Sequence, residues 1–217
     1  MTLNGLDTLP PSQNTADRIA EALRKAILQG QLHSGQSLRQ DEIAATFQVS
    51  KIPVREALFQ LQAEGLVDII HNRGAIVTSL NTAEIEELYT MRIALESIAL
   101  RRAIPRMTTA DFLTAEAILN HIDIEPNLRH WADLNWQFHE ALYRPSGMFH
   151  LLDVVKTLHT NVVRYLITQR VNGSQLHTSQ QEHRAILAHA RDGDVSAACA
   201  ALEQHLAGAV IAVSLKP

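Results

Sequence analysis

The chain has 217 residues, enough for two small domains, and its 19 Lys and Arg against 23 Asp and Glu give a formal net charge of −4. Both halves carry this slight acidic excess, so contact with nucleic acid would need a local group of basic side chains. The one cysteine, Cys199, excludes an internal disulfide and a multi-cysteine zinc site. Because the sequence has neither a run of about 18 apolar residues nor a secretory leader, we expect a cytoplasmic protein that does not enter a membrane.

The N-terminal part of the sequence predicts a leader followed by helices. Residues 1–14 are rich in Pro, Ser, Asn and Gly and are expected to form a flexible leader, with Thr15 as the N-cap of a first helix. Two short helices are expected next, at 40–47 and 50–64, because apolar residues recur at helical spacing in both. In the first of these two, the spacing places Phe47 on the inward face.

The helix expected at 50–64 is followed by a hairpin signal. Ser50 is a good N-cap for this helix, and Gly65 ends it. The β-branched stretches LVDII and AIVTSL then flank residues 71–74, which predicts a β-hairpin. Residues 15–80 are therefore expected to form a winged helix-turn-helix of three helices and a hairpin wing.

Residues 81–217 show helical periodicity almost throughout. Proline and glycine break it at five places, which leaves about six helices. These breaks are Pro105, Pro126, and residues 145–147, 172–174 and 191–193. The expected fold class is mainly α, with the winged helix-turn-helix followed by an all-α antiparallel helical bundle.

The start of the helix at 50–64 has the side chains that a DNA-reading helix needs. Such a helix presents its first turns to the major groove, and here these turns carry Ser50, Lys51 and Arg55. Lys51 and Arg55 share a face, and a guanidinium can pair with guanine or phosphate. His71 and Arg73 in the wing would reach the minor groove or the backbone. The alternative is that Arg55 is an ordinary solvated residue of a small helical domain.

The segment SLRQDEIAATFQVSKIPVREALFQLQAEGLVDIIHNRGAIVTSL resembles the DNA-binding domain of GntR-family repressors, most specifically in VSKIPVREAL and in the EGLV and NRGAIV parts of the wing. Several members of the FadR subgroup carry a basic residue where this chain has Asp41, so Arg39 is the expected substitute. The resemblance covers about residues 15–80. The operator contacts it implies are Ser50, Lys51, Arg55, His71 and Arg73.

The histidines point to chemistry in the second half, because only two of the 11 precede residue 121. Asn135 and His139 have the i, i+4 spacing of two ligands on one helix, and His183 and His205 have apolar neighbours that would turn them inward. Three imidazoles and one oxygen could hold Zn²⁺ or Ni²⁺ and leave positions open for a carboxylate. The alternative is that these are partly buried histidines satisfied by hydrogen bonds.

Residues 83–210 are similar to the FCD ligand-binding domain of the FadR subgroup, through MRIALESIAL, NWQFHEALY, EHRAILAHARDGD and the closing QHL. The metal pattern of that family is Asp-x3-His, His, His, which implies His139, His183 and His205 as ligands, with Asn135 in place of the aspartate. A neutral amide oxygen is a poorer ligand than a carboxylate. We therefore expect weaker metal binding, or an effector that completes the coordination.

Arg92 lies on a helix face otherwise made of apolar side chains, which is an unusual place for a free guanidinium. The resemblance implies that it points into the ligand cavity and clamps an organic acid. The alternative is an ion pair with Glu96 at i+4, and both can hold.

Together these features predict a homodimeric GntR-family regulator, repressor or activator, that binds two half-sites of operator DNA. A small carboxylate effector is expected between a divalent metal and Arg92, in a dimerisation and effector-binding domain at 81–217. One alternative is a metal-dependent enzyme, disfavoured because Glu140 and Glu182 need not point the same way as the adjacent His139 and His183. The other is a DNA-binding protein whose second domain only dimerises.

Overall fold

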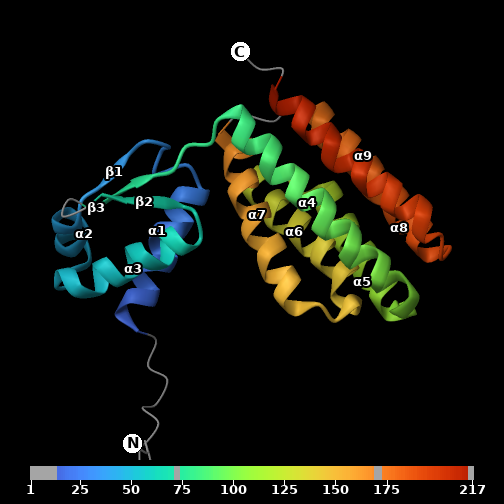
Figure 1. The fold of residues 1–217 in the computed structure, drawn as a ribbon, viewed down its shortest axis with the longest axis horizontal. Coiled ribbons are helices and arrows are strands. Elements are labelled where there is room, and N and C mark those ends of the chain that lie inside the picture. The colour runs from blue at the N-terminus through green and yellow to red at the C-terminus, as the bar shows by residue number, and fades with distance from the viewer. Residues whose placement is uncertain (1–13, 71–73, 169–172, 215–217) are drawn as a thin grey trace, which may run out of the picture. The chain divides into compact units, whose positions relative to one another are not determined.

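The computed structural model describes residues 14–70, 74–168 and 173–214 (Figure 1). The chain divides into two compact units, and the main division lies between Thr78 and Ser79. Within the described ranges, no helix has both the length and the apolar character that a membrane span requires.

The first unit combines three helices with a small sheet. Its helices are α1 (Thr15–Leu28), α2 (Gln40–Phe47) and α3 (Lys51–Ala63), and its strands are β1 (Ser37–Leu38), β2 (Val67–Ile70) and β3 (Gly74–Val77). The strand order is β1-β3-β2 with antiparallel pairing throughout, so β3 is the central strand. The sequence predicted the β2–β3 hairpin but not β1, because two residues are too few to show a strand period.

The core of the first unit forms where α1 and α3 turn apolar faces inward. Ile19 and Ile27 of α1 and Leu58 and Leu61 of α3 are almost completely buried. Burying such a side chain contributes about 1.5–3 kcal/mol relative to leaving it exposed. This packing fixes which face of α3 remains for solvent.

Two local predictions about the first unit were wrong. Thr15 is the first helical residue rather than the N-cap, because the side chain of Asn14 accepts a hydrogen bond from the backbone N–H of Ala16 at 3.3 Å. Phe47 is 38% exposed, since it ends α2 just before Gln48 turns the chain with a left-handed φ of 54°.

The second unit is the helical bundle. Its helices are α4 (Thr82–Ala103), α5 (Thr109–Ile124), α6 (Leu128–Tyr143), α7 (Phe149–Thr168), α8 (Gly173–Arg191) and α9 (Val195–Ser214). Short 3-10 turns follow α4 (Ile104–Arg106) and α6 (Arg144–Ser146). Helix α4 packs against α6, α7 and α9, and α8 packs against α5 and α9 (Figure 1).

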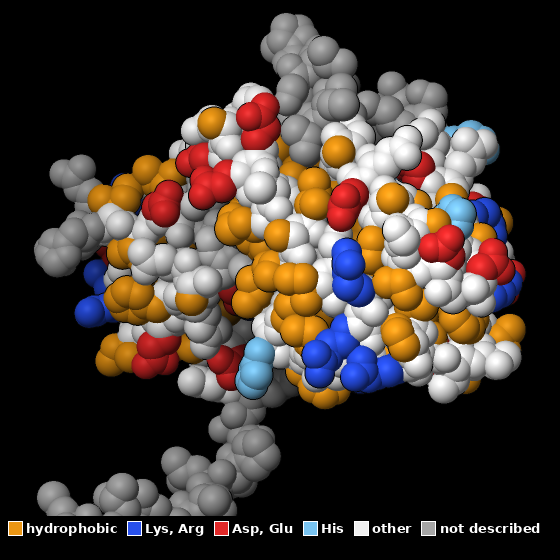
Figure 2. Space-filling model, turned by 45° about the vertical axis from the view of Figure 1, so that its right-hand side comes forward, with side chains coloured by type: hydrophobic (Ala, Val, Ile, Leu, Met, Phe, Trp, Pro, Cys, Tyr) orange, Lys and Arg blue, Asp and Glu red, His pale blue; other side chains and the backbone are white. Residues whose placement is uncertain are grey.

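Capping residues fix where the bundle helices begin. The Asn81 side chain accepts from the backbone N–H of Glu84, while Glu84 accepts from the backbone N–H of Asn81, and Thr108 and Asp111 form the same reciprocal pair at the start of α5. Between these helices lies one apolar core that includes Tyr89 and the buried Cys199. On the face drawn in Figure 2, acidic and basic side chains both lie among exposed hydrophobic ones.

Candidate functional site

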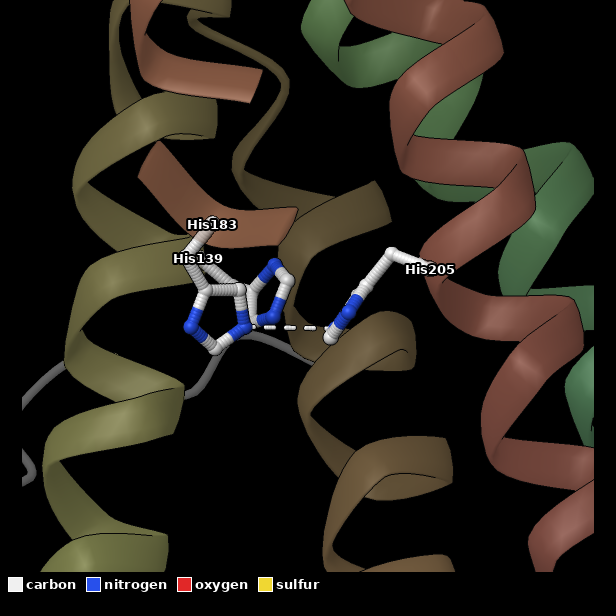
Figure 3. Close-up of side chains that lie close together, drawn as sticks. All are labelled: His139, His183 and His205. Atoms are coloured by element: carbon white, nitrogen blue, oxygen red, sulfur yellow. Dashed lines mark hydrogen bonds between the residues drawn. The ribbon is translucent and has the colours of Figure 1, made fainter. Parts of the chain in front are cut away.

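Three histidines from three helices meet inside the bundle (Figure 3). They are His139 on α6, His183 on α8 and His205 on α9, with exposed fractions of 0%, 0% and 8%. One ring nitrogen from each lies within 4.8 Å of those of the other two. The structure thus brings together the three histidines that the sequence analysis selected.

Two of the rings are oriented by polar side chains on α8. The Nδ1 of His183 lies 2.9 Å from Oε1 of Gln180, and the Nδ1 of His205 lies 2.8 Å from Oε2 of Glu182. Both partner atoms are oxygens that accept hydrogen bonds, so each Nδ1 carries the proton and donates it. In a neutral ring the Nε2 atom is then left with its lone pair.

The ring of His139 also carries a proton on its Nδ1 atom, and its hydrogen-bond partner there is a tyrosine. The hydroxyl of Tyr143 donates to Oε2 of Glu96 at 2.7 Å, and the Nδ1 of His139 lies 3.0 Å from the hydroxyl oxygen. Since the hydroxyl proton is committed to Glu96, the Nδ1 of His139 donates to the tyrosine oxygen. Burial beside Glu96 also raises the pKa of Tyr143 well above its usual range, which keeps the hydroxyl protonated.

This proton arrangement leaves three lone pairs facing one another. The Nε2 atoms of His183 and His205 are 3.2 Å apart (Figure 3), and when both rings are neutral with their protons on Nδ1, two lone pairs meet at this contact. An ion with Zn–N bonds of about 2.1 Å holds neighbouring ligand nitrogens about 3.0–3.4 Å apart. The residues present therefore fit a divalent cation that prefers imidazole.

Burial keeps the site in the form that binds metal. It lowers the pKa of His139 and of His183 well below the ordinary histidine range, and neighbouring histidines lower both further. A neutral imidazole is the form that coordinates a metal ion. These rings need no deprotonation at neutral pH before they bind one.

Asn135 lies one helical turn before His139 on α6, with only 7% of its surface exposed. Its Oδ1 atom is buried without a hydrogen-bond partner, and so is the Nε2 of His139. A buried acceptor without a partner is unfavourable unless something absent from the protein chain satisfies it. A cation at the histidine cluster would do so for the Nε2 of His139, and the i, i+4 spacing places Asn135 on the same face of α6.

Arg92 and Glu96 form a buried ion pair on α4, with Nε of the guanidinium 2.7 Å from Oε1 of the carboxylate. The pairing named as one alternative for Arg92 is thus present. Glu96 joins this pair to the histidine cluster, because its second oxygen accepts from the hydroxyl of Tyr143, which contacts His139. The guanidinium also lies over the ring of Tyr89, with Cζ 5.2 Å from the ring centre.

Sequence reasoning missed several residues around the cluster. The sequence left the direction of Glu182 open, and its carboxylate hydrogen-bonds His205 from the neighbouring helix. His159 of α7 is 4% exposed and its ring centre lies 6.4 Å from that of His139. Only the distances between helices reveal these contacts. The Gln180–His183 contact could have been found, because an i, i+3 spacing places both on one helix face.

The outward face of α3 carries the side chains expected to read DNA. Ser50, Lys51 and Arg55 are exposed, while the opposite face of α3 is buried. Lys51 Nζ lies 2.5 Å from Oδ1 of Asp41 at the start of α2, and its hydrogen bond and its charge lower the pKa of Asp41. The Arg55 guanidinium lies over the ring of Phe59, 5.6 Å from its centre.

Of the three remaining predicted DNA contacts, only Arg39 lies within the described residues. Arg39 is exposed and directly precedes α2, where its Nε lies 3.7 Å from Oε1 of Glu42. His71 and Arg73 of the wing lie outside the described residues.

The fold and the site define a class of protein, one with a winged helix-turn-helix joined to a helical ligand-binding bundle. Comparison with protein families gives the same division. Residues 15–77 match the family described as bacterial regulatory proteins, gntR family, and residues 87–208 match the FCD domain.

Individual relatives agree with these matches. The chain is 30% identical over 203 residues to the HTH-type transcriptional repressor RspR of Escherichia coli K12, covering 91% of this chain and 88% of that protein. It is 30% identical over 168 residues to the gluconate operon transcriptional repressor of Bacillus subtilis 168, covering 75% and 61%. The solved structure of E. coli McbR/YncC shares the fold, with a TM-score of 0.80 at 19% identity over 94% of this chain and 98% of that one.

The chain belongs to the GntR family of bacterial regulators, in the FadR subgroup with an FCD C-terminal domain. It is a transcriptional regulator that binds DNA through its helix-turn-helix, and not a metal-dependent enzyme.

Proposed function

We propose that this regulator is a repressor controlled by a small organic acid, which binds at a divalent metal ion held by Asn135, His139, His183 and His205. Zn²⁺ and Ni²⁺ are the ions that this donor set suits best. When bound, the ion supplies positive charge and open coordination positions for a carboxylate. The chain's own residues orient the imidazoles, exclude water and hold the second end of the effector.

The observation that carries the proposal is the convergence of three buried Nε2 lone pairs. A cluster of merely structural histidines would place hydrogen-bond donors against acceptors. Here the Nδ1 atoms of His183 and His205 donate to Gln180 and Glu182, so both Nε2 atoms face each other as acceptors. Oriented outer partners of this kind are typical of metal-binding histidines.

Arg92 is proposed as the residue that binds the effector's carboxylate. Its charge is already balanced by Glu96, so the effector must share the guanidinium with that carboxylate. Glu96 also holds Tyr143, which in turn holds His139. An effector bound to both the ion and Arg92 therefore acts on one buried network that joins α4 and α6. The name of one relative refers to a gluconate operon, which supports an organic acid as the effector class.

For the DNA half, we propose that Arg39, Ser50, Lys51 and Arg55 contact the operator, together with His71 and Arg73 of the wing. The exposure of Lys51 and Arg55 at the first turns of α3 supports this assignment. A homodimer would present two such helices to the two half-sites of a palindrome. The effector can shift operator affinity only by the difference in its own affinity for the two arrangements of the dimer.

One experiment tests both halves of the proposal with two variants that serve as controls for each other. Purified wild type, His183→Ala and Arg55→Ala are each assayed for bound metal by elemental analysis. Each is also assayed for footprint protection of an operator that the wild type has selected from random duplexes. We expect His183→Ala to lose its metal but keep the footprint, because the site and α3 lie in different units.

Arg55→Ala should show the reverse pattern, with full metal content and no footprint. Loss of a bidentate arginine contact weakens binding to one site by about 1–3 kcal/mol. Equal metal content in wild type and His183→Ala would contradict the metal site. An unchanged footprint with Arg55→Ala would contradict the assignment of α3 as the DNA-reading helix.

A further inference from the structure

Unpaired polar atoms in the described part of the bundle gather on two adjacent helices. The buried side-chain atoms without a hydrogen-bond partner belong to Asn135, Trp136 and His139 on α6 and to His159 and Asn161 on α7. The proposed metal ion accounts for two of them, the Oδ1 of Asn135 and the Nε2 of His139. It does not account for the indole Nε1 of Trp136 or for either ring nitrogen of His159.

Trp136 and His159 lie together beside the cluster of His139, His183 and His205. Their ring centres are 5.1 Å apart, and the ring of His159 lies 6.4 Å from that of His139. His159 does not belong to the group of three histidines whose nitrogens converge. Asn161 follows two residues later on α7 and so points to another side of the helix. The Trp136–His159 pair is therefore a separate feature next to the ion.

The chemistry of the two side chains specifies the group that would satisfy them. An indole N–H can only donate a hydrogen bond, whereas a neutral imidazole donates from one nitrogen and accepts at the other. Burial, together with the charge of Arg92, holds His159 in this neutral form by lowering its pKa. A carboxylate can only accept, so it can pair with the indole N–H and the imidazole N–H but not with the lone pair on the other nitrogen of His159. A hydroxyl group can accept from the indole and donate to the imidazole at once.

We propose that Trp136 and His159 form a second subsite of the effector pocket, which binds a hydroxyl group, so that the effector is a hydroxy acid. This inference rests on the proposed function, because it needs the ion and Arg92 to hold the carboxylate end. A buried site built to pair with a hydroxyl disfavours the analogue that lacks it, since its own polar groups then stay unpaired.

The test compares acids of equal charge that differ by one hydroxyl group. Butyrate is paired with 3-hydroxybutyrate, and succinate with malate, and each is titrated by calorimetry into the Zn²⁺-loaded full-length protein. We expect the hydroxylated member of at least one pair to bind about tenfold or more tightly. Elemental analysis of the same samples reports on the metal site separately.

Two variants distinguish binding of the hydroxyl group by the subsite from binding of the hydroxyl group by the metal ion. Trp136→Phe keeps the aromatic ring but removes the N–H, and His159→Leu keeps most of the volume but removes both nitrogens. Either change should abolish the preference for the hydroxy acid while leaving the metal content unchanged. His150→Ala, an exposed histidine on the same helix, serves as the control and should behave as the wild type.

Three results would overturn the proposal. The first is equal affinity for both members of each pair, which means that water already satisfies the two side chains. The second is a preference for the hydroxy acid that persists in both variants, because the metal ion and not the subsite would then bind the hydroxyl group. The third is loss of metal in His159→Leu, which makes His159 a metal ligand. A wild type that binds no metal contradicts the proposed function as well, whereas a metal-loaded wild type without a preference contradicts the subsite alone.

Discussion

Each of the three clustered histidines has a different partner at its Nδ1 atom. His183 donates to an amide oxygen, His205 to a carboxylate, and His139 to a tyrosine whose own proton goes to Glu96. A carboxylate partner makes an imidazole a stronger electron donor than an amide does. The three nitrogens thus differ in basicity although all three point to one place.

At Asn135 the proposed donor set differs from the Asp-x3-His pattern that the family resemblance implies. The substitution Asn135→Asp adds one negative charge opposite the divalent ion, so we expect the metal to bind about tenfold or more tightly. Competition with a chromophoric chelator measures this change. The matched control is Asn120→Asp on the exposed face of α5, which should leave metal affinity unchanged. Unaltered affinity in Asn135→Asp would show that position 135 is not a ligand.

How far the sequence predicts individual residues depends on where their partners lie. Asn135 and His139 could be paired because i, i+4 spacing on one helix fixes their separation. Tyr143 and Glu96 are 47 positions apart, and no pattern within either helix shows that they touch. For the same reason His159 had no signal in the sequence, since its neighbour Trp136 lies on a different helix.

The sheet of the first unit depends on close backbone contact at one glycine. Gly74 begins β3 with a φ of +116°, and a Cβ there would overlap the carbonyl oxygen of Leu38 in β1. That approach lets β3 pair with Leu38 on one side and with β2 on the other. The pairing of β1 with the hairpin therefore requires a residue without a side chain at position 74.

Gly74→Ala should separate β1 from β3 and destabilise the first unit by about 2 kcal/mol or more. Gly35→Ala is the matched control, because Gly35 also has a positive φ, of +79°, but nothing lies within 4 Å of its Cβ position. Both tryptophans lie in the second unit, so hydrogen exchange of the strand amides gives the readout. Equal exchange rates in the two variants would show that the strain at φ alone, and not the overlap with Leu38, determines the cost.

At the scale of whole elements, the sequence predicts a helix or strand well where apolar residues recur at a regular spacing and where Pro, Gly or capping residues mark its ends. Proline and glycine breaks predicted the six bundle helices, and Asn81 with Glu84 starts α4 as a capping box should. β1 was missed because its identity comes from the partner strand and not from its own two residues. The exposure of Phe47 likewise follows from where α2 ends, which its apolar period did not show.

At the scale of the molecule, three neutral histidines in one core link the stability of the second unit to pH. Burial lowers the pKa of His139, His159 and His183 in the folded state, whereas each titrates near its usual value of about 6.5 in the unfolded chain. Below that value the unfolded state binds more protons than the folded state. The free energy of unfolding therefore falls as the pH falls through about 6.5, by up to about 1.4 kcal/mol per histidine and pH unit.

We expect the metal-free protein to lose stability steadily between about pH 7 and pH 5, while a group with an unshifted pKa would contribute no slope. Urea unfolding followed by the fluorescence of Trp131 and Trp136 measures this in the second unit. His159→Leu should reduce the slope by about a third, because one of the three neutral rings is gone, and His150→Ala should not change it. Zn²⁺ should raise the free energy of unfolding most at neutral pH, since protons and the ion compete for the same Nε2 lone pairs. A stability that does not change over this range would mean that the buried rings keep ordinary pKa values, and the lone-pair arrangement at the cluster would then be wrong.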